Sequence, residues 1–187
     1  MRTQGTQVHL LPALFAALSL VAGVCGSRTM PSVPYDLRFI EAMVAHHEGA
    51  IEMARPAQTQ ALHPELKEFA LKVIADQSRE VEQMKGWRTQ WYPGRPGSTD
   101  IYSMPGMTRT MMDISPMHMD KLSGAAFDNM FVQMMIPHHE GAVTLARDAL
   151  AKSQRPEVRK LAQEIIAAQQ REIEMMKRWT EEWKAAK

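Results

Sequence analysis

Cysteine is almost absent from this chain, which has a single thiol, Cys25, among 187 residues. A lone cysteine forms neither an internal disulfide nor a thiolate cage for a metal ion. An excess of one charge sign is also lacking, because 22 basic and 21 acidic side chains leave a formal net charge of +1. That balance gives no electrostatic reason to expect nucleic acid as a partner. Methionine, by contrast, is abundant, with 16 residues.

The N-terminal segment has the features of an export signal. Arg2 precedes an apolar run from Leu10 to Val24, which has the length of a signal-peptide core and is short for a membrane span. We expect residues 1–26 to be a signal peptide and the mature protein to work outside the cytoplasm, in the periplasm or at the cell surface. Cleavage would release a secreted chain, whereas lipidation of Cys25 would anchor it, so membrane attachment is expected only through the N-terminus.

The central motif of the chain occurs twice. Residues 43–50 read Met-Val-Ala-His-His-Glu-Gly-Ala, and residues 135–142 read Met-Ile-Pro-His-His-Glu-Gly-Ala. Residues 36–91 align with residues 128–183 without a gap, which indicates an internal duplication. The identities include polar residues that a helix core does not require: the paired histidines, Gln77 with Gln169, and Glu80 with Glu172.

Each repeat predicts a helical hairpin. Pro64 and Pro156 stand where the second helices would begin, and no segment alternates in the manner of a strand. Apolar residues recur at helical spacing, and one hairpin cannot cover its own apolar face. We therefore expect an all-α fold, a four-helix bundle made of residues 35–92 and 127–184 and joined by a methionine-rich crossover linker, residues 93–126.

Three local features modify this regular plan. Pro56 stands inside the first helix, where the second repeat has Asp148, and should kink or shorten that helix. The linker is too long for a bundle turn, and its Ser115-Pro116 pair predicts one short helix over residues 116–122. Tryptophans recur near the helix ends and are expected to cap the core, with a cation–π contact as the alternative: Trp87, Trp91, Trp179 and Trp183.

The histidine pairs lie on the apolar face of the first helix of each hairpin. If the chain reverses midway between the two helices, His46 and His47 face residues 77–80, and Met43 lies level with residues 81–84. The second repeat gives the same arrangement with His138, His139, residues 169–172, Met135 and Met176. Adjacent helical residues point about 100° apart, so we expect one histidine of each pair to be a ligand and the other a hydrogen-bond partner or a ligand to a second site.

Thioether and imidazole groups without thiolate suit Cu(I) or Ag(I). The linker holds further methionines among glycines and prolines, and we expect them to be mobile and exposed: Met104, Met107, Met111, Met112, Met117 and Met119. Met117, His118 and Met119 form either an auxiliary site for metal capture or an amphipathic part of the linker. A di-iron centre needs Glu-x-x-His spacing, which neither repeat contains, so iron is a poorer fit than copper.

Each of these features also has a purely structural explanation. Methionine at helical spacing is most often core filler. A buried histidine can be satisfied by a carboxylate on the partner helix, in which case Glu80 and Glu172 hold the helices in register without any metal. Both explanations stay open at the level of sequence.

The doubled motif resembles a known family. The pattern Met-(Ile/Val)-x-His-His-x-Gly-Ala-(Ile/Val), followed by Pro-Glu-(Leu/Val) and Gln-x-x-Glu-(Ile/Val)-x-x-Met, is similar to the domain of unknown function 305 family from about Tyr35 to Trp183. The end of the linker, from Leu122 to Asp128, also resembles the family's approach to its second His-His helix. The resemblance implies a ferritin-like four-helix fold, an exported bacterial protein and, for some members, copper binding through methionine and histidine with a role in copper resistance.

Carried over by position, the resemblance implies two sets of metal residues. They are Met43, His46, His47 and Met84 in the first half, and Met135, His138, His139 and Met176 in the second. The side chains expected to support these ligands from the partner helices are Gln77, Glu80, Gln169 and Glu172. Ala45 stands where the second repeat has Pro137, so the two halves need not bind equally.

The sequence favours an exported, non-catalytic protein that binds Cu(I) for buffering, resistance or transfer to another copper-handling protein. No nucleophile with a base, phosphate loop or open hydrolytic metal site is visible, so an enzyme is not the first expectation. Two alternatives remain. One is a structural or interaction module whose histidine–glutamate pairs only link helices, and the other is a redox metalloprotein with a metal buried between the hairpins.

Overall fold

The computed structural model of the chain describes residues 33–98, 100–108 and 121–185. In this part of the chain all regular structure is helical, as expected. The elements are α1 (Tyr35–Ala54), α2 (Ala57–Gln60), α3 (Pro64–Trp91), the 3-10 helix η1 (Ile101–Ser103), α5 (Gly124–Lys152) and α6 (Pro156–Ala185). None of these described helices is long and apolar enough to cross a membrane.

Two sequence predictions fall outside the described residues. One is the signal peptide of residues 1–26, with Cys25. The other is the auxiliary site of Met117, His118 and Met119, together with most of the short helix expected around it. Both stay predictions.

Prolines set the helix bounds in both hairpins. α3 and α6 begin at Pro64 and Pro156, where the missing N–H costs nothing because first-turn donors have no acceptor within the helix. α1 ends at Ala54, just before Pro56, whereas α5 of the second repeat continues to Lys152. Pro56 therefore shortens the first helix, as predicted, and the chain turns through α2 before α3 begins.

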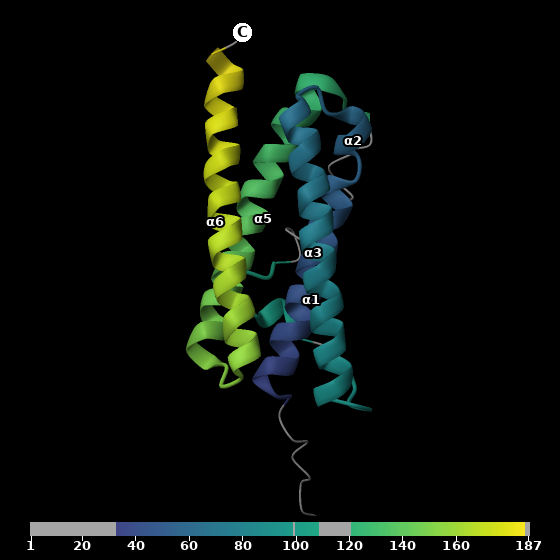
Figure 1. Cartoon of the computed structure of the whole chain (residues 1–187), viewed down its shortest axis with the longest axis vertical. Coiled ribbons are helices and arrows are strands. Elements are labelled where there is room, and N and C mark those ends of the chain that lie inside the picture. The colour runs from purple at the N-terminus through teal and green to yellow at the C-terminus, as the bar shows by residue number, and fades with distance from the viewer. Residues whose placement is uncertain (1–32, 99, 109–120, 186–187) are drawn as a thin grey trace, which may run out of the picture. The chain divides into compact units, whose positions relative to one another are not determined.

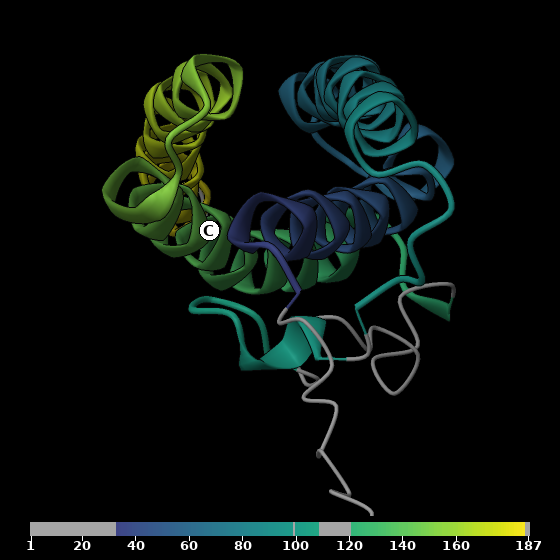
Figure 2. The ribbon, with the colours of Figure 1, turned by 90° about the horizontal axis from the view of Figure 1, so that it is seen from below.

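The two hairpins pack through their first helices. α1 lies against α5, α3 lies along α1, and α6 lies along α5 (Figure 1). Over their lengths α3 and α6 form no comparable interface, and Figure 2 shows them standing apart on the same side of the α1–α5 pair. The four long helices are those of the predicted hairpins, and a groove separates α3 from α6.

The core consists of two apolar clusters with a polar layer between them. One cluster draws on residues 37–43 of α1 and 142–149 of α5, and the other on residues 50–54 of α1 and 127–135 of α5. Between the clusters each of the four long helices contributes buried polar side chains: His46, His47, Gln77, His138, His139, Gln169 and Glu172. Each cluster therefore needs both repeats, which explains why one hairpin does not suffice.

The start of the linker packs against the outer side of the α1–α5 pair (Figure 2). Met104 and Met107 are only 3% exposed and join the cluster that contains Met43. Gly106 has φ +82°, and a Cβ there would lie 2.1 Å from the carbonyl oxygen of Gly141, so only glycine permits this approach. The prediction that linker methionines are exposed is wrong for Met104 and Met107, because this turn docks on α5.

Tryptophans close both ends of the core and contact residues of the other repeat. The guanidinium of Arg155 lies 4.1 Å from the ring centroid of Trp91, which is the cation–π contact considered from the sequence. At the opposite end the His63 ring stacks on Trp183, with centroids 4.2 Å apart. His63 also pairs with the fully buried carboxylate of Asp128, with 2.5 Å between Nδ1 and Oδ2. These contacts tie the repeats together at both ends.

Candidate metal centre

The four histidines of the doubled motif meet in the polar layer. His46 on α1 and His138 on α5 are in contact, with ring centroids 3.9 Å apart. His46 is fully buried and His138 is 2% exposed. Within each pair the rings lie further apart, with 6.4 Å between His46 and His47 and 6.5 Å between His138 and His139, as adjacent helical positions require. The centre of the layer therefore belongs to both repeats.

The second histidine of each pair is held by a glutamate of its own hairpin. His47 Nε2 lies 2.6 Å from Glu80 Oε2, and His139 Nε2 lies 3.0 Å from Glu172 Oε2, in the register that the sequence predicts. A carboxylate at Nε2 favours the proton there and leaves the lone pair of a neutral ring on Nδ1. Burial would raise the pKa of Glu172, but the bond from His139 and the charge of Lys72 hold it below its ordinary value.

Several buried nitrogens of this layer have no hydrogen-bond partner. Neither ring nitrogen of His46 or His138 is bonded, and Nδ1 of His47 and of His139 is also unpaired. Buried polar side chains are normally satisfied, so these nitrogens call for an explanation. The lone pair of a neutral imidazole is a common metal ligand, and a bound cation would satisfy it. The donor set therefore fits a metal ion in the layer.

The two central histidines are neutral at ordinary pH. Burial lowers the pKa of His46 to about 3, and the nearby rings of His47 and His139 act in the same direction. An interaction with the backbone of His138 acts in the opposite direction and raises this pKa slightly. Burial, together with His46, also lowers the pKa of His138 well below its ordinary value. Protons therefore do not compete with a cation for these nitrogens.

Fully buried methionines border the polar layer on both sides. Met43 and Met84 belong to one apolar cluster, and Met135 and Met176 belong to the other. Met43 precedes His46 by three residues, which places both on one face of α1, and the second repeat has the same spacing. All the metal residues implied by the resemblance thus lie in or beside one layer. Among the described residues no three histidine, cysteine or acidic side chains form a ready-made metal cage.

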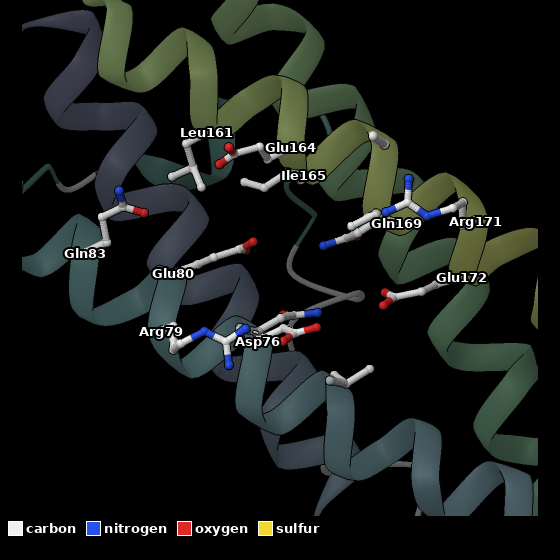
Figure 3. A pocket seen from close by; sticks show the side chains of 14 residues that line it. Asp76, Arg79, Glu80, Gln83, Leu161, Glu164, Ile165, Gln169, Arg171 and Glu172 are labelled. Atoms are coloured by element: carbon white, nitrogen blue, oxygen red, sulfur yellow. Dashed lines mark hydrogen bonds and ion pairs between the residues drawn. The ribbon is translucent and has the colours of Figure 1, made fainter.

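A groove of about 460 Å³ between α3 and α6 leads to this layer. Its walls include Gln77 from α3. They also include Glu80 from α3, and Gln169 and Glu172 from α6 (Figure 3). The Oε1 atoms of both glutamines are buried and unpartnered. Neither glutamine is bonded to a histidine nitrogen, whereas each of the two glutamates is.

The contact between His46 and His138 was not predicted from the sequence. The geometry of a hairpin predicts which residues of one repeat face each other. It does not predict how the two repeats pack against each other. A usable signal was nevertheless present, because two equal hairpins sharing one core approach two-fold symmetry, which brings equivalent residues together near the axis. The same limit hid the bond from Lys72 to Glu172, which joins α3 to α6.

Comparison with known proteins supports the resemblance seen in the motifs. The profile of a domain of unknown function, DUF305, matches residues 36–180. The chain belongs to the DUF305 family. Solved DUF305 structures from Streptomyces coelicolor, described as secreted, and from Deinococcus radiodurans are 25% and 28% identical to it, with TM-scores of 0.67 and 0.63. They cover 75% and 79% of this chain, which in turn covers 88% and 96% of theirs.

This DUF305 chain is also similar to structures of CopM. The Cu(I)-bound form of CopM is 37% identical, with a TM-score of 0.67, over 81% of this chain and 99% of that chain. The Cu(II)-bound form is 38% identical, with a TM-score of 0.66, over 79% and 97% of the two chains. An Ag-bound form gives 38% identity and a TM-score of 0.66 over 79% and 96%. No curated protein matches the chain.

Proposed function

We propose that this DUF305 protein is an exported metal-binding protein that holds Cu(I) or Ag(I) in its buried polar layer. The observation that carries the proposal is the complete burial of His46 and His138 with no partner for any ring nitrogen. Burying an unpaired imidazole costs free energy, and a coordinated cation would offset that cost. Imidazole and thioether donors together favour soft ions such as Cu(I).

The proposed ligands form a central group with outer members on either side. His46 and His138 form the centre, and His47 and His139 contribute through Nδ1 while a glutamate holds Nε2. The thioethers complete the set from the two apolar clusters: Met43, Met84, Met135 and Met176. The similarity to CopM, whose solved forms contain Cu(I), Cu(II) and Ag, supports this class of ligand.

The role that fits such a site is buffering, resistance or transfer of copper, with a copper-handling protein as the partner, rather than catalysis. The metal ion lies among packed side chains, with the α3–α6 groove as its opening. Export through residues 1–26, with release or lipidation at Cys25, completes the proposal. Mass spectrometry of the mature chain identifies its first residue and any lipid on it.

A competition experiment tests the proposal. Mature protein beginning after Gly26, which lacks the only thiol, is titrated with Cu(I) and with Zn(II) against a chromogenic chelator. We expect tighter binding of Cu(I), and loss of the tightest site in the His46→Ala/His138→Ala variant with helical circular dichroism retained. His63→Ala is the matched control, because His63 lies outside the polar layer and should not alter affinity.

The alternative, a structural module that binds no metal in this layer, predicts the opposite result. If the histidine–glutamate pairs only link helices, the His46→Ala/His138→Ala variant should bind as much Cu(I) as the parent protein. Equal or stronger binding of Zn(II) would likewise contradict the soft-metal proposal.

A further inference from the structure

The two ends of the α3–α6 groove occupy equivalent positions in the repeat but differ in charge. Residue 72 is lysine, whereas its repeat equivalent, residue 164, is glutamate. Lys72 Nζ lies 3.1 Å from Glu172 Oε1 and covers that carboxylate. At the other end Glu164 lines the groove together with Glu80 (Figure 3). In the described part of the chain Glu80 pairs with a histidine and with no lysine or arginine.

The remaining charges of the groove reinforce this difference. Asp76 accepts bonds from Lys72 and from Arg79, so the first of the two equivalent arginines is neutralised by an acidic neighbour. Residue 168, which is equivalent to Asp76, is alanine. Arg171 therefore lacks the corresponding acidic partner and lines the groove next to Glu172 (Figure 3). The Glu172 end therefore holds Lys72, which Asp76 and Glu172 share, and Arg171, which has no equivalent of Asp76 beside it.

The floor of the groove offers oxygen atoms that suit a cation in transit. Gln77 and Gln169 line it and are only 4% and 3% exposed, and the Oε1 atom of each has no partner. They are buried in the same layer as the four histidines, and each precedes by three residues the glutamate that holds a histidine of its own hairpin. Unsatisfied oxygen acceptors thus line the groove within the layer that holds the buried histidines.

We propose that cations reach the buried layer through the Glu80 end of the groove, and that Lys72 screens the Glu172 end. The inference rests on the proposed function and adds a route and an order of loading, with His47 meeting the ion before His139. Among the described residues Glu164 has only the exposed Lys160 beside it, at 3.7 Å, and Glu80 pairs with no lysine or arginine. This end therefore attracts a cation, because the low-dielectric walls of a cleft focus the field. A lysine beside the equivalent carboxylate repels the ion and occupies the oxygen that would receive it.

Uptake kinetics test this route. Double-mixing stopped flow combines the protein with Cu(I) and adds a chromogenic chelator after a set delay, which reports the Cu(I) still free. At low ionic strength we expect Glu164→Gln to slow uptake about threefold and Lys72→Gln to accelerate it about twofold to threefold. Both effects should fade near 1 M salt, where the Debye length is about 3 Å.

A charge swap provides the matched control. The Lys72→Glu/Glu164→Lys variant has the same net charge as the parent protein and exchanges the character of the two ends. In the parent background Glu80→Gln should slow uptake more than Glu172→Gln does, by about threefold. In the swapped background Glu172→Gln should instead slow Cu(I) uptake more than Glu80→Gln does. If these glutamates had a purely structural role, the charge swap would not change which of the two variants takes up Cu(I) more slowly.

The outcomes separate this inference from the function on which it rests. If the parent protein holds no Cu(I) at the end of the time course, the proposed function fails. If the end point is normal but neither Glu164→Gln nor Lys72→Gln changes the rate, the function stands and the proposed route is wrong. The route is also wrong if Lys72→Gln slows uptake or if the swap leaves Glu80→Gln the slower variant.

Discussion

The ring of His46 touches the ring of His138, with centroids 3.9 Å apart, although the two residues belong to different repeats and different hairpins. Both are buried, and neither ring forms a hydrogen bond. Duplication therefore did not simply produce two separate half-sites. It produced a shared centre to which both hairpins contribute.

A double-mutant cycle tests whether the centre is shared. We expect His46→Ala and His138→Ala each to lower the Cu(I) affinity of the tightest site about 100-fold or more, and the double variant to cost little beyond either single one. Chelator competition gives both affinity and stoichiometry. Two independent half-sites would instead leave one site at full affinity in each single variant.

Glu80 and Gln77 should differ in their effect on stability. Glu80 holds the buried ring of His47, so Glu80→Leu should lower the free energy of unfolding by about 1–3 kcal/mol. The Oε1 of Gln77 has no partner to lose, so Gln77→Leu should be close to neutral or stabilising. Urea unfolding of the metal-free protein measures both. Equal losses at the two positions would contradict this division of roles.

The stability of the metal-free protein should fall in mild acid. Burial lowers the pKa of His46 to about 3 and that of His138 well below its ordinary value. In the unfolded chain both histidines titrate near 6.5, so below that pH the unfolded state binds more protons and is favoured. As the pH falls below about 6.5, the two groups together lower the free energy of unfolding by up to about 2.7 kcal/mol per pH unit. Above about pH 7 they should cause no change.

The control for this pH dependence is the His46→Leu/His138→Leu variant. Its unfolding free energy, followed by denaturant titration at each pH, should have a shallower slope below about pH 6.5. An unchanged slope would mean that other groups carry the acid sensitivity.

The two buried linker methionines should tolerate apolar replacements and resist polar ones. Met104 and Met107 pack into the core, so leucine at both positions should cost less than about 1.5 kcal/mol each, whereas glutamine should cost more. Thermal unfolding measures the difference, and the tightest Cu(I) site should survive the leucine changes. Loss of that site on Met104→Leu/Met107→Leu would place these sulfurs among the ligands.

The hairpins and their register could be predicted because the evidence for them is local. Helical spacing, Pro64 and Pro156 set the helices, and the position of the reversal places His47 opposite Glu80. Pro56 also acts as expected, since a missing N–H breaks a helix whatever surrounds it.

What could not be predicted depends on contacts between distant segments. The loop that contains Gly106 has the composition of an exposed turn, yet its docking on Gly141 buries Met104 and Met107. The charge difference across the groove is equally non-local. Lys72 acts on Glu172 across two helices, and only the packing of the hairpins reveals that pairing.

The most direct test of the central claim is the copper K-edge X-ray absorption spectrum of the Cu(I)-loaded mature chain, compared with that of the His46→Ala/His138→Ala variant. A chain that begins after Gly26 has no cysteine, so any sulfur shell around copper must come from methionine. We predict both sulfur and imidazole scattering in the parent protein, and weaker imidazole scattering in the variant, where only His47 and His139 can supply it. A shell of nitrogen and oxygen alone, or identical spectra for the two proteins, would contradict the account.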